Sequence, residues 1–321
     1  MNKTKRLNLI GILLLLSATV VWGSSFFILK ETISELPTFY VLAIRFLVAG
    51  ICLFLVFFKK IKKMTKRTLI HGLILGLWLV SAYLTQTIGL ENTTPGRNAF
   101  LSSLYCIMCP FIIWGLFKVR PRIHNVVSAI LCVAGILLVS LSQINGQTYF
   151  FGDAMTIVGA FFFGLQIIFS DKYQKEGSDT VQMLVMEILA TGVFFAILSL
   201  VLEVPSQPIT NFALNLDQAL KLLYLTLMCT LYAQAVQIVG LKFVSANQGA
   251  IVLSLESVFG VLFSVVFADE KLTLPIVLGF VIIFVSLLMS ELGGDIFAKL
   301  KKGKTKEVAK DNLLQQNGEK K

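Results

Sequence analysis

Charged residues are scarce in this chain of 321 residues, of which Asp, Glu, Lys and Arg make up 14%. Soluble domains carry about 25% charged residues. Hydrophobic residues instead account for 56% of the sequence. The chain therefore has too few charged residues to cover itself with a polar surface. The sequence excludes a soluble globular protein and predicts a membrane protein.

Residue patterns that carry chemistry are also missing. There are two histidines, and no HExxH, GxSxG or Walker A pattern occurs. Cys106 and Cys109 have the CxxC spacing of redox and zinc pairs, but they lie in an apolar run without a His or acidic neighbour, which favours small hydrophobic residues. We expect no enzyme, no ATP drive from this chain, no cofactor and no metal.

Long apolar runs are what the chain has in abundance. A transmembrane helix needs about 20 apolar residues at a rise of about 1.5 Å per residue. Ten runs approach that length: 9–29, 37–58, 69–90, 96–117, 126–141, 151–170, 181–202, 219–240, 248–267 and 274–292. The sequence thus predicts an all-α membrane protein with ten transmembrane helices.

Basic residues lie almost entirely on one side of these runs. Of the 28 Lys and Arg residues, 23 fall in the N-terminus, the loops after even-numbered runs and the C-terminal tail. Basic loops stay in the cytoplasm, so both termini are expected on the cytoplasmic side. The membrane is expected to be the plasma membrane. The net charge of +10 is then an orientation signal, and no nucleic-acid partner is expected. The exceptions are Lys30, Arg45, Arg97, Lys221 and Lys271.

An internal repeat organises the chain. Residues 94–118 align without a gap on residues 245–269, yet the first copy ends in Lys118 and the second in Asp269. Basic and acidic ends indicate that the copies cross the membrane in opposite directions, which is a transporter architecture. We expect two inverted five-helix repeats, 8–142 and 149–293, and a disordered cytoplasmic tail, 294–321. Matched pairs include Gly11 with Gly152, Arg45 with Glu187, Gln86 with Gln237, Gly89 with Gly240 and Tyr105 with Glu256.

Several motifs resemble those of one transporter family. They are Trp22 to Lys30 (WGSSFFILK) with Pro37 and Arg45-Phe46, Gly152-Asp153, Leu255 to Phe259 (LESVF), and Asp269 to Leu272 (DEKL). Together they resemble the EamA family, the ten-span branch of the drug/metabolite transporter superfamily. The resemblance implies a secondary transporter that exports a small metabolite, such as an amino acid or a related amphipathic compound, by alternating access.

Polar residues inside the runs are the site candidates, because polar groups in hydrocarbon face a partner or a water-filled cavity. Glu256, in the middle of its run, is expected to contact substrate or a coupling proton, or else to be a hydrogen-bonded structural residue. Arg45 and Glu187 lie at similar depths and either form a pair or act independently. Asp153 is expected to cap a helix. The remaining substrate-binding candidates are Trp22, Ser25, Tyr83, Gln86, Tyr105, Gln234 and Gln237.

Two alternatives stay open within transport: an importer and a lipid-carrier flippase of the same fold. An intramembrane enzyme would need a nucleophile and base, or a metal cluster, at depth, and the sequence shows neither. The expected partners are a small-molecule substrate and the lipid bilayer, with the chain acting as a monomer or a homodimer.

Overall fold

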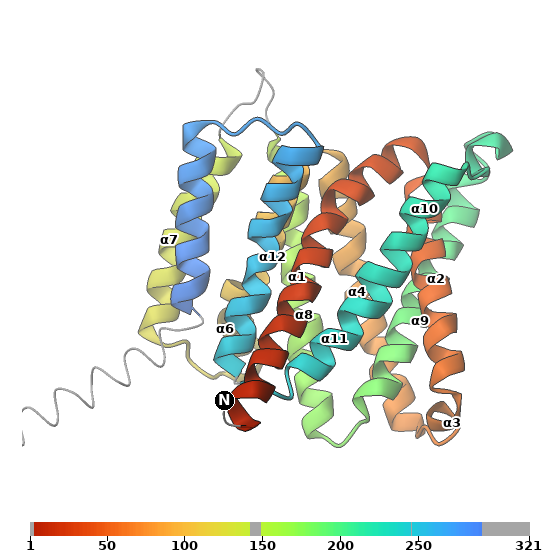
Figure 1. Cartoon of the computed structure of the whole chain (residues 1–321), viewed down its shortest axis with the longest axis horizontal. Coiled ribbons are helices and arrows are strands. Elements are labelled where there is room, and N and C mark those ends of the chain that lie inside the picture. The colour runs from red at the N-terminus through yellow and green to blue at the C-terminus, as the bar shows by residue number, and fades with distance from the viewer. Residues whose placement is uncertain (1–2, 142–148, 245, 291–321) are drawn as a thin grey trace, which may run out of the picture.

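The computed structural model describes residues 3–141, 149–244 and 246–290, and these are helical apart from short connections (Figure 1). The predicted tail, 294–321, lies outside the described residues. The helices are α1 (Lys3–Glu35), α2 (Thr38–Val56), α3 (Phe58–Ile61), α4 (Lys66–Glu91), α5 (Pro95–Ser102), α6 (Tyr105–Phe117), α7 (Ile123–Ser140), α8 (Phe150–Lys175), α9 (Thr180–Leu198), α10 (Leu216–Tyr224), α11 (Ala233–Gly240), α12 (Ala246–Phe267) and a final helix, Leu274–Ser290. Two π-helical segments, η1 (Ser199–Glu203) and η3 (Leu225–Tyr232), and one 3₁₀ turn, η2 (Ile209–Phe212), join them.

Seven helical segments are long and apolar enough to cross a membrane. Three shorter apolar helices accompany them: Ile123–Val139, Val252–Phe267 and Leu274–Ser290. Each coincides with one of the predicted runs. The described part of the chain is therefore an all-helical protein built for a bilayer, as its hydropathy predicts.

Local sequence signals set several helix starts. Thr94 caps α5 by accepting a hydrogen bond from the backbone N–H of Arg97, and Pro95 follows in the first turn. Asp179 caps α9 by accepting from the N–H groups of Val181 and Gln182. Such caps satisfy backbone donors that a helix start leaves unpaired, and Pro is tolerated there because it has no N–H to lose.

The predicted span 96–117 is present as the apolar segment Pro95–Phe117, but it is not one regular helix. The segment is interrupted at Ser103 and Leu104, between α5 and α6, and Pro110 lies inside α6. The Ser103 hydroxyl bonds to the carbonyl oxygen of Ala99, 3.2 Å away. A Ser side chain that competes for backbone acceptors, followed by a Pro without an N–H, weakens the regular hydrogen-bond ladder here.

Close glycine contacts join the two halves of the chain. A β-carbon at Gly11 of α1 would lie 3.0 Å from the carbonyl oxygen of Gly240 of α11. One at Gly89 of α4 would lie 2.8 Å from the carbonyl oxygen of Gly152 of α8. Only residues without a side chain allow backbones to approach this closely, which is how membrane helices pack in the absence of a hydrophobic driving force.

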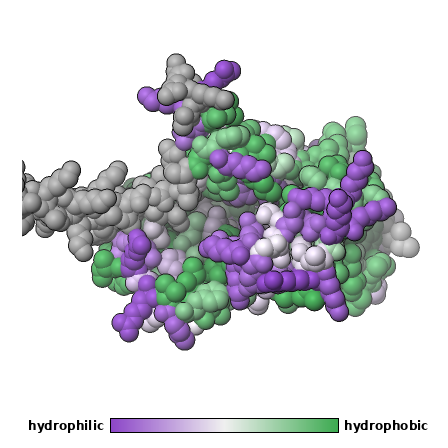
Figure 2. Space-filling view, turned by 90° about the horizontal axis from the view of Figure 1, so that it is seen from below, coloured by the Kyte–Doolittle hydropathy of each residue, from purple (hydrophilic) through white to green (hydrophobic). Residues whose placement is uncertain are grey.

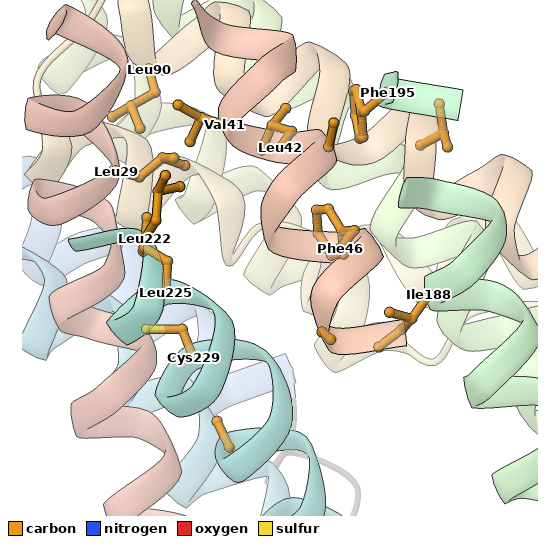
Figure 3. Packing of buried hydrophobic residues seen from close by; sticks show 14 of the residues in the cluster. Leu29, Val41, Leu42, Phe46, Leu90, Ile188, Phe195, Leu222, Leu225 and Cys229 are labelled. Carbon is orange, nitrogen blue, oxygen red and sulfur yellow. The ribbon is translucent and has the colours of Figure 1, made fainter. Parts of the chain in front are cut away.

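The largest apolar core cluster lies where α1, α2, α4, α9 and α10 meet (Figure 3). Phe46 and Phe195 stack with ring centroids 6.2 Å apart and are almost completely buried. Leu222, Leu225 and Cys229 extend the cluster from α10 into η3. This cluster joins helices from both halves of the sequence into one unit.

One end of the bundle, the lower end in Figure 1, carries exposed ion pairs. Lys60 contacts Asp179 at 2.7 Å and Arg67 contacts Glu176 at 2.7 Å. The hydrogen bond from Arg67 holds the pKa of the Glu176 carboxyl below its ordinary value. Seen from this end, hydrophilic side chains gather in a broad patch with hydrophobic ones beside it (Figure 2). It is the end where the predicted cytoplasmic loops lie.

Candidate functional site

A cavity of about 430 Å³ runs between the helices of both halves. It is enclosed by α1, α2, α4, α5, α6, α8, α9, η3, α11 and α12. Every site residue predicted from the sequence lies along its wall: Trp22, Ser25, Arg45, Tyr83, Gln86, Tyr105, Glu187, Gln234, Gln237 and Glu256. The structure thus brings together side chains from seven separate helical segments.

The cavity is open at one end and closed at the other. Its lining reaches Asp171 and Gln174 in the last turn of α8, and both are exposed. These residues lie next to Glu176, at the end that bears the Arg67 ion pair. At the opposite end the lining residues Leu90 and Asn98 are 1% and 0% exposed. A solute can therefore enter from the end that carries the basic loops.

The closed end of the cavity contains an ion pair that sequence reasoning missed. Arg97 of α5 binds Asp153 of α8, and the two side chains are 0% and 1% exposed. Thr93 also donates a hydrogen bond to Asp153, at 2.8 Å, and the Arg97 guanidinium lies 5.2 Å from the ring centre of Tyr149. Asp153 is therefore not the helix cap that the sequence predicts, since Tyr149 occupies the cap position of α8.

Further polar contacts seal the same end. The Lys30 ammonium donates to the carbonyl oxygens of Leu90 and Glu91, at 2.6 and 2.8 Å, and so joins α1 to α4. The backbone N–H of Gly96 donates to Glu270, 2.9 Å away, which ties the start of α5 to the loop after α12. A layer of paired charges and backbone contacts thus separates the cavity from this face.

Arg45 presents a positive charge to the cavity. Its Nε donates to the Thr230 hydroxyl at 2.9 Å, and its guanidinium lies 5.3 and 5.4 Å from the ring centres of Phe46 and Tyr83. Among the described residues, Thr230 is the sole hydrogen-bond acceptor of this guanidinium. Its other N–H groups are available to an anion in the cavity, because Arg presents several donors in one plane.

Glu187 does not pair with Arg45 within the described residues. It accepts instead from the Gln166 amide at 2.7 Å. The structure therefore has no ion pair between Arg45 and Glu187 among the described residues. Both line the cavity, but each is held by a neutral neighbour, Thr230 or Gln166. Similar depth along two helices does not set the direction in which side chains leave them.

Glu256 faces the cavity from the middle of α12. In the described part of the chain its carboxyl group has neither a hydrogen-bond nor an ion-pair partner. It shares the wall with Tyr83 and Tyr105, two phenols that can donate a hydrogen bond. An acidic group without a protein partner, facing a cavity at mid-helix, is available to a cation or a proton.

The π-helical segment η3 supplies one contact to Arg45, from Thr230, and one to Trp22, from Cys229. The Thr230 hydroxyl bonds back to the carbonyl oxygen of Leu225 at 3.0 Å, five residues earlier. The carbonyl oxygen of Cys229 accepts from the Trp22 indole N–H at 2.8 Å. A π-helical turn shifts the backbone register, so it exposes carbonyl groups that in a regular helix accept hydrogen bonds within the helix. Sequence pattern carries no signal for this segment.

The neutral polar residues divide into bound and open groups. Gln86 donates to the Ser102 hydroxyl at 2.7 Å, and Ser25 donates to the carbonyl oxygen of Trp22 at 2.7 Å. Near the closed end, the Thr87 hydroxyl and the Asn98 carbonyl oxygen are buried and have no partner within the described ranges. Some of the neutral polar groups along the wall are thus held by the protein itself, and two others near the closed end are buried without a partner. The described residues hold no group of three or more His, Cys, Asp and Glu suited to a metal ion.

Comparisons with known proteins agree with this architecture. The profile of the EamA-like transporter family matches residues 9–141 and 150–292. An "Uncharacterized transporter" of Archaeoglobus fulgidus is 29% identical over 254 residues, which cover 79% of this chain and 77% of that protein. The "Probable amino-acid metabolite efflux pump" of Escherichia coli is 24% identical over 291 residues, which cover 88% of this chain and 95% of that protein.

A solved structure has the same fold. It is titled only as the crystal structure of a protein and is 16% identical to this chain. It superimposes with a TM-score of 0.60 over 88% of this chain and 97% of its own. At this identity the likeness concerns the fold alone.

Proposed function

This chain belongs to the EamA-like transporter family, and we propose that it exports an amino acid or a related amphipathic metabolite across the plasma membrane. Membership of the family and relatives named as transporters make it a membrane transporter. The proposal adds the substrate class, the direction and the mechanism. Its mechanism is alternating access, in which two halves rock about a central site without ATP.

The proposed architecture is ten spans in two inverted repeats, 8–142 and 149–293. The glycine contacts support it, because Gly11 matches Gly152 and Gly89 matches Gly240 in the sequence repeat. The contact between Gly11 and Gly240 is therefore the repeat image of the contact between Gly152 and Gly89. Two halves that make equivalent contacts with each other can exchange roles, as alternating access requires.

One observation carries the functional proposal: three repeat-matched pairs face a single cavity. They are Arg45 with Glu187, Gln86 with Gln237 and Tyr105 with Glu256. Polar groups are costly in hydrocarbon, and buried structural polar groups are normally hydrogen-bonded. Six polar residues from equivalent positions of both halves, arranged around one space, are what a substrate site at a repeat interface needs.

The charges of the cavity favour a zwitterion. In this proposal the unpaired N–H groups of Arg45 take the carboxylate of the substrate, and Glu256 takes its ammonium group or a coupling proton. Phe46 and Tyr83, beside Arg45, provide apolar area for a side chain. A single basic side chain at this position fits a carboxylate better than a multiply charged phosphate, which usually meets several basic groups.

The open end is compatible with the proposed direction. The cavity opens where Lys60 and Arg67 lie, and the positive-inside rule assigns that end to the cytoplasm. The structure then corresponds to the inward-facing state, in which a cytoplasmic substrate loads. The relative from Escherichia coli is named an efflux pump, which is consistent with outward movement.

The test is flux of labelled amino acids through proteoliposomes that contain the purified chain. Arg45→Gln keeps a hydrogen-bond donor but removes the charge. It should lower amino-acid flux by about 10- to 100-fold, because a hydrogen bond to a charged group contributes about 1.5–3 kcal/mol. Flux of the matching amino-acid amide, which lacks the carboxylate, should change less. An equal loss for both compounds would refute the carboxylate role of Arg45.

A flippase for a lipid carrier is the second candidate within the family fold. It would need an opening from the cavity to the hydrocarbon. Proteoliposomes that move a labelled lipid carrier but no amino acid would replace the proposal with this alternative.

A further inference from the structure

A second hollow lies on the side of α6 that faces away from the cavity. It is a groove of about 550 Å³ between α6, α7 and α8, lined almost entirely by apolar side chains. The groove and the cavity share no lining residue, so α6 and α8 separate them. Its lining is Leu104, Ile107, Met108, Phe111, Ile112, Gly115, Leu116, Ala129, Cys132, Val133, Ile136, Phe161 and Leu165.

The groove lies between apolar helices suited to a membrane and ends beside basic residues. Gly115 and Leu116, in the last turn of α6, are exposed and lie just before the loop that joins α6 to α7. That loop carries Lys118, Arg120 and Arg122, all exposed. From α8, the Lys172 ammonium lies 5.5 Å from the ring centre of Phe117, which brings a fourth positive charge to the same end.

We propose that this groove binds one acyl chain of an anionic phospholipid whose headgroup contacts Lys118, Arg120, Arg122 and Lys172. A lipid chain gains no hydrophobic free energy when it moves from other lipid chains into a protein groove, because both surroundings are equally apolar. Selectivity therefore has to come from the headgroup. Basic clusters between transmembrane helices are suited to anionic headgroups, and the attraction falls off within a Debye length.

The backbone of Lys118 is a second sign of a constrained position. Its φ of 62° places it in the left-handed region, at the C-terminal cap of α6. Glycine is the residue favoured there, and a residue with a β-carbon is strained. The chain nevertheless has Lys, whose ammonium lies 3.3 Å from the carbonyl oxygen of Gly115, at the mouth of the groove.

The groove can be filled without disturbing its walls. A β-carbon at Gly115 would meet no atom within 4 Å, so a side chain can start there without a clash, and Gly115→Leu adds apolar volume to the lining of the groove. The charges at the basic end can be removed without disturbing the backbone, with Lys118→Gly, Arg120→Gln and Arg122→Asn. Glycine relieves the positive φ at position 118, and Asn is a favoured helix cap at position 122.

The experiment counts lipids that the purified full-length protein retains, by native mass spectrometry from mixed micelles with phosphatidylglycerol or phosphatidylcholine. Wild type should retain one phosphatidylglycerol in preference to phosphatidylcholine. Neutralising the three basic residues should weaken retention by about fivefold for each charge removed. Gly115→Leu should abolish it, while its melting temperature in detergent stays that of wild type.

The matched control removes three charges from a different loop at the same end, with Lys59→Gln, Lys62→Gln and Lys63→Gln, and should retain lipid like wild type. Equal retention of both lipids would show ordinary boundary lipid and overturn the proposal. Retention that survives Gly115→Leu but is lost on neutralisation would reduce the site to a charged surface, and this also overturns it. Displacement of the lipid by inorganic phosphate alone would point to an anion site that holds no acyl chain, and the proposal would fail in that case too.

Discussion

Arg97 and Asp153 form an ion pair that is almost completely buried and joins α5 to α8 beneath the closed end of the cavity. Taking two charges out of water costs several kcal/mol per ion, so a buried pair is retained only where its geometry compensates. Here Thr93 and Tyr149 also contact the two charges. Since the pair links the two halves of the chain, any opening at this end has to separate these charges or carry them together.

Removing one partner of this pair should destabilise the protein strongly. Asp153→Asn leaves Arg97 charged and buried, and breaking a buried pair costs about 3–5 kcal/mol. The control is Asp171→Asn, which breaks the exposed pair with Lys175 and should cost about 0–1 kcal/mol. Thermal unfolding in detergent measures both. Similar losses for the two variants would contradict the structural role given to Asp153.

Glu256→Gln tests the proposed site directly. The variant keeps the size and most of the hydrogen-bonding capacity of the side chain but cannot ionise. It should reach the membrane in normal amounts, while substrate flux falls by about 10- to 100-fold or loses its pH dependence. Glu176→Gln, which removes an exposed carboxylate at the end of the bundle, is the control. Unchanged flux and an unchanged pH profile for Glu256→Gln would make Glu256 a structural residue.

The proposed orientation predicts a labelling pattern. In a background without cysteines, Ser206→Cys should react with a membrane-impermeant reagent in intact cells, and Lys63→Cys should react only after lysis. The reason is that Lys63 lies in the basic loop before α4, whereas Ser206 follows η1 at the opposite end of the bundle. The reverse pattern would show that the protein has the opposite orientation, and the cavity of this structure would then be outward-facing.

Acid should weaken the contact between α4 and the loop after α8. The Arg67 hydrogen bond lowers the pKa of the Glu176 carboxyl, so the folded protein binds this proton less tightly than the unfolded chain does. The stabilisation is complete above the unfolded pKa of about 4.3 and is lost as the pH falls through the lower, folded pKa. The melting temperatures of wild type and Glu176→Gln should differ at about pH 7 and converge once the pH has fallen below the folded pKa. A difference that persists in acid would assign the effect to packing.

Some features of the site were within reach of sequence reasoning and others were not. Glu256 and Arg45 stand out because each is an ionisable residue in an apolar run, and the bilayer penalises such residues unless they have a use. Arg97 carries the same signal, since it is one of the five basic residues that break the charge asymmetry. Its partner Asp153 lies 56 residues further on, and nothing local connects the two.

The sequence by itself determined the class of protein, the approximate position of its helices and the bias of its basic loops. These follow from hydropathy and charge, because each segment enters or leaves the bilayer according to its own composition. Only the tertiary structure decided that Arg45 and Glu187 stay apart, that Arg97 binds Asp153, and that the cavity is open at a single end. Such relationships depend on how helices cross and on the direction in which each side chain leaves its helix. A break of two residues at Ser103 or a π-helical turn at Thr230 changes that direction without changing the pattern of apolar residues.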